Sequence, residues 1–158
     1  MEGPFFWQDH SGAASAAPYL YLFYSGSSTW GTTYAVGVAR ATSIYGPWTK
    51  MSASRNGDAE GGAQRHNNAN NNNNNPLLHT RIGSNSTNTT FVSPGHNSIT
   101  VDPVGGGTFI VYHASKWGKT GLNCIRYMMV DRLEWGSDGW PTLSTPDGSP
   151  SDGPLPVP

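Results

Sequence analysis

The chain has 158 residues, with 9 Lys plus Arg against 10 Asp plus Glu, so its formal net charge is −1. Charged residues make up only 12% of the chain, whereas Gly (20), Pro (12) and Trp (6) are abundant. The length fits one domain or part of one. The lack of a basic field argues against a nucleic-acid partner, and no stretch is long and apolar enough to predict a membrane span.

Short runs rich in aromatic and β-branched residues begin at the N-terminus. The sequence predicts strands over Glu2–Gln8, Tyr19–Ser25 and Tyr34–Arg40, with turn material between the second and third. The second and third runs therefore predict an antiparallel hairpin. Gly46-Pro47-Trp48 closes this first unit with a turn and an aromatic side chain.

A second unit of the same kind begins near Asn97. Strands are predicted over Ser98–Asp102, Thr108–His113 and Cys124–Asp131, the last continuing through Trp135. Two successive units of short strands, with no helical periodicity, predict an all-β fold. Radial repetition of small antiparallel sheets is typical of a β-propeller.

Between the two units lies a long polar insertion, residues 51–90, which contains the uninterrupted run Asn70–Asn75. A segment this poor in apolar residues cannot bury enough surface to fold alone, so it predicts a disordered loop. Pro76-Leu77-Leu78 within it predicts a brief edge strand. The folded domain is therefore expected over residues 1–143, followed by a disordered Pro/Gly/Ser-rich tail at 144–158.

Two tripeptides of the insertion, Asn85-Ser86-Thr87 and Asn88-Thr89-Thr90, match the N-glycosylation pattern. This pattern favours a secreted parent protein, although no secretory signal is visible in this chain. Cys124 is the single cysteine, so no internal disulfide and no cysteine-based metal spacing exist, and we expect a buried small apolar side chain there.

Glu2 is a candidate general acid. It stands before a Gly-Pro turn and the aromatic run Phe5-Phe6-Trp7, which we expect to exclude water. Such surroundings disfavour the charged form of a carboxyl group, so Glu2 is predicted to stay protonated near neutral pH and to donate a proton. The alternative is a solvated glutamate without a role.

His96 is the histidine whose setting points to a function. It lies in Ser93-Pro94-Gly95-His96-Asn97-Ser98, a predicted tight turn that opens a strand and suits a metal ligand or a residue that tunes a carboxylate. The alternative is a turn histidine that bonds to backbone. His113 is expected in the core, and His10, His66 and His79 are expected in solvent.

Other polar and aromatic residues have simpler interpretations. Asp102 precedes Pro103 and predicts a turn former, whereas Asp131 and Arg132 predict a structural ion pair. Trp30 and Trp117 could line a groove, but the simpler prediction places them in the core between two sheets.

Taken together and in order, these motifs resemble glycoside hydrolase family 43 from Glu2 to about Leu143, interrupted by the insertion. The residues that carry the resemblance are Glu2-Gly3-Pro4, Tyr19–Gly26, Tyr34–Ala39, Ser43–Trp48, Gly95–Ser98, Asp102-Pro103, Val111–Ala114, Asp131–Leu133 and Asp138–Pro141.

The resemblance implies a five-bladed β-propeller, of which this chain holds about two blades. It implies an enzyme that hydrolyses O-glycosyl bonds of arabinose- or xylose-containing plant polysaccharides with inversion at the anomeric carbon. The resemblance also implies that Glu2 is the general acid. It further implies that His96 lies near the centre of the propeller, where part of the family holds calcium.

The chain departs from the family in one respect. The aspartate that serves as base and a further aspartate that tunes the acid lie in earlier blades, and no aspartate of this chain matches them. The resemblance therefore predicts a C-terminal fragment of a secreted glycosidase, poorly stable and inactive by itself. Two alternatives remain: a non-catalytic carbohydrate-binding remnant, and a protein-interaction propeller whose exposed apolar flank dimerises.

Overall fold

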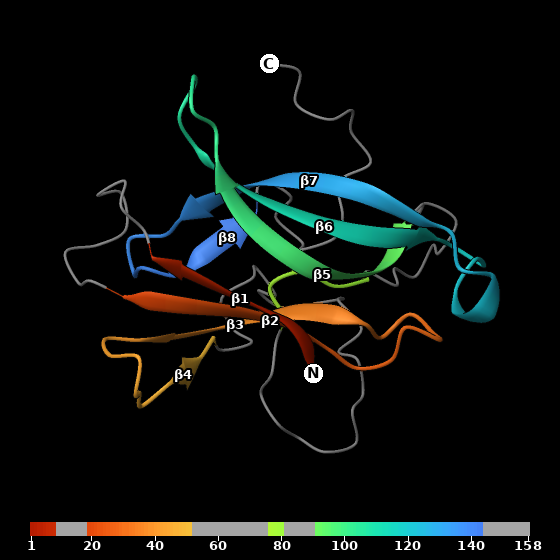
Figure 1. Ribbon diagram of the computed structural model, residues 1–158, viewed down its shortest axis with the longest axis horizontal. Coiled ribbons are helices and arrows are strands. Elements are labelled where there is room, and N and C mark those ends of the chain that lie inside the picture. The colour runs from red at the N-terminus through yellow and green to blue at the C-terminus, as the bar shows by residue number, and fades with distance from the viewer. Residues whose placement is uncertain (9–18, 52–75, 81–90, 144–158) are drawn as a thin grey trace, which may run out of the picture.

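The structure of this chain is a computed structural model that describes residues 1–8, 19–51, 76–80 and 91–143. In these ranges the chain forms two antiparallel sheets of four strands each (Figure 1). The first sheet has the order β1 (Glu2–Gln8), β2 (Leu20–Gly26), β3 (Ala35–Ala41), β4 (Thr49–Lys50); the second has the order β5 (Phe91–Val101), β6 (Thr108–Lys116), β7 (Arg126–Trp135), β8 (Pro141–Leu143).

Both sheets are simple meanders, because each strand pairs with the next strand along the chain. In the first sheet Phe23 of β2 lies opposite Phe5 of β1 and Val38 of β3. In the second sheet Val111 of β6 lies opposite Ser98 of β5 and Val130 of β7. The predicted hairpin and the predicted all-β class are confirmed.

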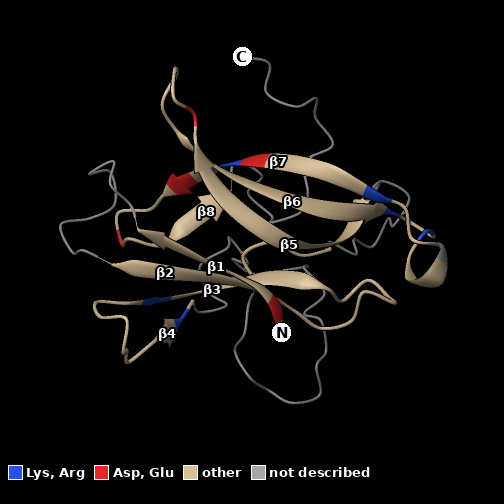
Figure 2. Ribbon diagram, in the orientation of Figure 1, with Lys and Arg blue, Asp and Glu red and all other residues tan. Residues whose placement is uncertain are grey.

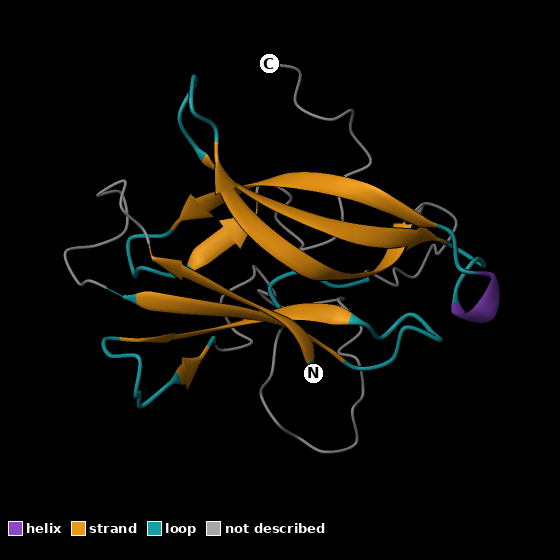
Figure 3. Ribbon diagram, viewed as in Figure 1, coloured by secondary structure: helices purple, strands orange, loops and turns teal. Residues whose placement is uncertain are grey.

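The apolar core lies between the two sheets, which form two layers in Figure 3. Alternate side chains of β2 are buried, as expected for a strand with one face on a core. Strand β5 of the second sheet contacts β1, β2 and β3 of the first. The inner face of the first sheet contributes Tyr21, Phe23, Val36 and Val38, and the second sheet contributes Ile99, Ile110, Tyr112, Ala114, Met129 and Leu133.

Some residues of the predicted insertion belong to this core. Met51, Leu77 and Leu78 are almost completely buried, and Leu78 forms a two-way backbone bridge with Val36. The brief strand-like contact predicted at Pro76-Leu77-Leu78 is thus found as an isolated bridge. The Asn run, both glycosylation tripeptides, His10, His66 and the tail lie outside the described residues.

Charged side chains are sparse on the sheets and gather near strand ends and turns (Figure 2). Asp102 accepts hydrogen bonds from the backbone N–H groups of Val104 and Gly105, so its predicted role as a turn former is confirmed. Asp131 is buried and accepts a hydrogen bond from the Tyr112 hydroxyl. No helix in the described part of the chain has the length and apolar character needed to cross a membrane.

Candidate functional site

Glu2 begins β1, and its side chain is exposed to solvent. Its carboxylate Oε1 accepts a hydrogen bond from the hydroxyl of Tyr34, and this bond holds the pKa of Glu2 below its ordinary value of 4.5. The predicted water-excluding setting, with a raised pKa, is therefore wrong for the described residues. Of the three aromatic residues, Phe5 and Trp7 pack against the core cluster and Phe6 packs on Trp48, so none of them buries Glu2.

Tyr34 is the buried partner of Glu2. It lies directly before β3, is 1% exposed, and stacks on the ring of His113 with centroids 6.0 Å apart and planes 6° apart. Burial and then the Glu2 carboxylate raise the pKa of Tyr34 to about 12, so its hydroxyl remains a hydrogen-bond donor at neutral pH.

Gly95 makes room for this phenol ring. A Cβ atom at residue 95 would lie 1.8 Å from Cε1 of Tyr34, which no side chain could tolerate. Gly95 sits opposite His113 across the β5–β6 ladder, so the ring of Tyr34 crosses β5 at the one residue that lacks a side chain. Gly95 of the Gly95-His96 motif is therefore needed for the packing of Tyr34, whatever the chemical role of His96.

His96 follows directly and lies within β5, at an irregular stretch of the ladder rather than in a turn that opens a strand. This corrects the predicted turn. The residue has φ +54°, its side chain is exposed, and its ring centroid is 6.2 Å from that of His113. Its backbone lies against Gly3, because a Cβ on Gly3 would be 3.3 Å from Cα of His96. The structure therefore brings the Glu2 and His96 motifs together.

A chain of hydrogen bonds links these two motifs. The backbone N–H of His96 donates to Oγ of Ser25 at 2.7 Å, and the Ser25 side chain hydrogen-bonds Tyr34. Tyr34 then donates to Glu2. Ser25 and Tyr34 in this link are buried, whereas Glu2 at its end is exposed. No local motif predicted Ser25 or Tyr34, because the segments that they join lie 32 and 71 residues apart in the chain.

His113 and Asn97 are polar side chains in this region without hydrogen-bond partners in the described residues. Both ring nitrogens of His113 and both amide atoms of Asn97 are buried and unpaired. Burial, followed by the charges of Arg126 and His96, lowers the pKa of His113 to about 4, so its ring is neutral at neutral pH. His113 was expected in the core, and the structure places it there only partly buried.

Calcium prefers six to eight oxygen ligands. The described residues contain no group of three or more His, Cys, Asp or Glu side chains that could hold a metal ion. The ring neighbour of His96 is another imidazole, which offers nitrogen rather than oxygen. By themselves the described residues therefore do not fit a calcium site.

An open hollow of about 370 Å³ is lined by Glu2, Tyr34 and Trp30. Its lining also includes the hydroxyl side chains of Ser27, Ser28 and Thr29. Trp30 is 66% exposed and Trp117 is 45% exposed, so the prediction that placed them in the core is wrong.

Cys124 is only partly buried, and its sulfur lies 2.9 Å from the Ser115 hydroxyl.

Comparison with known proteins gives consistent matches. The model of glycosyl hydrolases family 43 matches residues 60–141, just over half of the chain. An "Extracellular endo-alpha-(1->5)-L-arabinanase 2" from Bacillus subtilis (strain 168) is 30% identical over 130 residues, which are 80% of this chain and 27% of that protein.

Two solved structures extend the likeness to the fold. A thermostable family-43 glycoside hydrolase is 29% identical, with a TM-score of 0.63 over 99% of this chain and 39% of its own. The endo-1,5-alpha-L-arabinanase of Thermotoga petrophila RKU-1 is 25% identical, with a TM-score of 0.58 over 91% of this chain and 31% of its own. The chain therefore spans between about a quarter and two fifths of these relatives.

Proposed function

Because this chain belongs to glycosyl hydrolases family 43, we propose that it supplies about two blades of a five-bladed β-propeller in a larger, inverting glycoside hydrolase. Each four-stranded meander is one blade in this proposal. The match of nearly the whole chain to less than two fifths of a solved family-43 structure supports it.

The proposed substrates are arabinose- or xylose-containing plant polysaccharides outside the cell. Two of the relatives are named as arabinanases, and one of these is named as extracellular, which favours arabinan. This chain needs neither nucleic acid nor a membrane as a partner in the proposed reaction.

Glu2 is the proposed general acid, which protonates the glycosidic oxygen as the bond breaks. Inversion also needs a carboxylate base about 6.5–9.5 Å from the acid, with a water molecule between them. Among the described aspartates, Asp131 accepts a hydrogen bond from Tyr112 and Asp102 caps its own turn. We assign the base to a part of the propeller outside this chain because no aspartate here matches the position of the family's base, and the chain alone is then inactive.

The low pKa of Glu2 has a place in this proposal. With Tyr34 as its partner in the described residues, the carboxyl group is ionised at neutral pH and cannot donate a proton. A second carboxylate nearby would raise its pKa, because two like charges disfavour joint ionisation. The completing blades would therefore turn Glu2 into an acid as well as supply the base.

The observation that carries the proposal is the junction of the Glu2 and His96 motifs beside an open hollow. To test it, residues 1–143 would replace the matching segment of the Bacillus subtilis relative, and hydrolysis of 1,5-arabinan would be measured. We expect turnover from the chimera, and a fall of about 10²–10⁴-fold in its Glu2→Gln variant. Equal turnover by both proteins, with folding confirmed by circular dichroism, would sink the assignment of Glu2.

One observation favours a second function, a non-catalytic carbohydrate-binding remnant. An exposed tryptophan on the same open hollow as Glu2 is a surface that could hold sugar without cleaving it. In this case the chain binds oligosaccharide, the chimera is inactive, and Glu2→Gln leaves the binding constant unchanged.

Calcium remains a proposal for the complete propeller only. The described residues offer His96 but lack the oxygen ligands that calcium prefers. Thermal melts with calcium and with EDTA should therefore coincide for residues 1–158. A shift with calcium would show that this chain binds the ion without further blades.

A further inference from the structure

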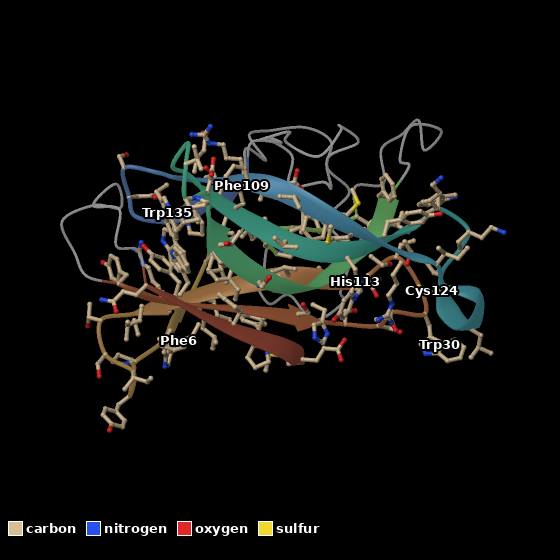
Figure 4. All side chains as sticks on the ribbon, turned by 45° about the horizontal axis from the view of Figure 1, so that its top comes forward. Phe6, Trp30, Phe109, His113, Cys124 and Trp135 are labelled. Atoms are coloured by element: carbon tan, nitrogen blue, oxygen red, sulfur yellow. The ribbon has the colours of Figure 1, made fainter. Side chains whose placement is uncertain are left out.

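Trp30 is a large apolar side chain that is 66% exposed and yet held in place. It lies in the loop between β2 and β3, at the end of the molecule next to the short 3-10 helix η3 (Gly121–Asn123; Figure 4). Single exposed apolar side chains are common on protein surfaces, so the case for a ligand rests on the fixed loop and on the hollow beside the indole.

Hydrogen bonds fix the loop on both sides of Trp30. The backbone N–H of Trp30 donates to Oγ of Ser28 at 3.2 Å, and the Thr120 hydroxyl donates to the backbone carbonyl of Trp30 at 3.5 Å. The Ser27 hydroxyl donates to that of Thr33 at 2.8 Å. A loop held in this way loses little conformational entropy when a ligand binds.

A glycine supports the indole. A Cβ atom at Gly121 would lie 3.5 Å from Cε3 of Trp30, so the ring rests close to the backbone of η3. Gly121 has φ +77°, a conformation that favours glycine, and this keeps a side chain out of the space beside the ring. The indole is thus backed by protein while most of its area stays open to solvent.

The hollow beside Trp30 has the chemistry of a sugar site. Flat apolar faces of sugar rings stack on aromatic side chains, and their hydroxyl groups pair with hydroxyl side chains. The lining of the hollow includes the indole of Trp30, the hydroxyl side chains of Ser27, Ser28 and Thr29, and Glu2. Its volume of about 370 Å³ lies in the range of small-molecule sites.

We propose that Trp30 is a stacking platform that binds one pentose ring of an arabino- or xylo-oligosaccharide and so holds the sugar chain in the hollow that leads to Glu2. This inference rests on the proposed function for its ligand class. The geometry of the loop makes Trp30 a binding residue and gives it no part in proton transfer.

The test is a titration of residues 1–158 with α-1,5-arabinotriose and with xylotriose. Binding is followed by calorimetry and by the indole N–H resonance of Trp30, which is identified by its absence in Trp30→Ala. We expect this resonance to move and Trp30→Ala to weaken binding at least about fivefold, whereas Trp30→Phe keeps most of the affinity. Far-UV circular dichroism and the melting temperature of Trp30→Ala should match the parent.

Tyr45→Ala is the matched control, because Tyr45 is 96% exposed in the turn between β3 and β4 and does not line the hollow. It should bind as the parent does. The platform is overturned if Trp30→Ala keeps full affinity, if sugar binds without moving the Trp30 resonance, or if neither sugar binds. The activity of the chimera and of its Glu2→Gln variant tests the proposed acid separately. Failure of the stacking proposal and failure of the proposed hydrolase function therefore give different results.

Discussion

The hydroxyl of Tyr34 donates a hydrogen bond to Oε1 of Glu2, across 32 residues of sequence. Because Tyr34 is buried between β5 and the ring of His113, its position is set by the contact of the two sheets. Glu2 thus has a partner whose place depends on the packing of one sheet on the other.

Tyr34→Phe should raise the pKa of Glu2 toward 4.5, because it removes the largest cause of the lowered value. The bond stabilises the fold above the unfolded pKa of Glu2, and this contribution is lost as pH falls through the lower folded pKa. Carbon-13 NMR titration of the Glu2 carboxyl group checks the shift. Tyr24→Phe is the control and should leave the Glu2 titration unchanged.

Gly95→Ala should destabilise the fold by about 2–4 kcal/mol, because the new methyl group overlaps the ring of Tyr34. Gly31→Ala is the matched control. Nothing lies within 4 Å of its added Cβ, and it is expected within about 0.5 kcal/mol of the parent. Urea unfolding of both variants measures the difference, and equal midpoints would contradict the packing reason given for Gly95.

The stability of the parent should fall as pH falls from about 6.5 to about 4. His113 has a folded pKa of about 4 and an ordinary value of 6.5, so in this window the unfolded chain binds the extra proton. The neutral His113 ring contributes fully to the stability of the fold above pH 6.5, and this contribution is lost as the pH falls toward 4. Because the ring of His113 is only partly buried, we expect its titration to lower the free energy of unfolding by about 1–2 kcal/mol across this window.

His113→Phe isolates that contribution, because phenylalanine keeps a ring against Tyr34 and cannot titrate. The difference between the unfolding free energies of parent and variant should change across pH 4–6.5 and stay flat above it. A difference that is constant with pH would show that His113 does not cause the loss.

Leu78→Ala should cost about 2–5 kcal/mol, since Leu78 is fully buried in the core between the sheets. Leu122→Ala, at a residue that is 86% exposed, should stay within about 0.5 kcal/mol of the parent. Chemical denaturation of the two variants compares them directly. Similar midpoints would mean that the bridge of Leu78 to Val36 is not part of the cooperative unit.

Much of the fold could be predicted from local sequence. The runs Tyr19–Ser25 and Tyr34–Arg40 show the pattern of half-buried strands, and the observed bounds of β2 and β3 differ from them by one residue. Strand β5 was harder, because Pro94 and Gly95 interrupt its pattern and its ladder is irregular there. The three-residue β8 was missed, since it has too few residues to show a period.

The site was predictable only as separate motifs. Glu2 and His96 were identified from short motifs, and their proximity arises from Gly3 lying against His96. Tyr34 and Trp30 could not be assigned roles, because their partners lie far away in the chain. The pKa of Glu2 was predicted in the wrong direction for the same reason, as it depends on Tyr34 rather than on the neighbouring aromatics.

Met51 and Leu78 anchor both ends of the intervening tract in the same core. The core that joins the two sheets therefore also fixes where the chain leaves the first sheet and where it returns.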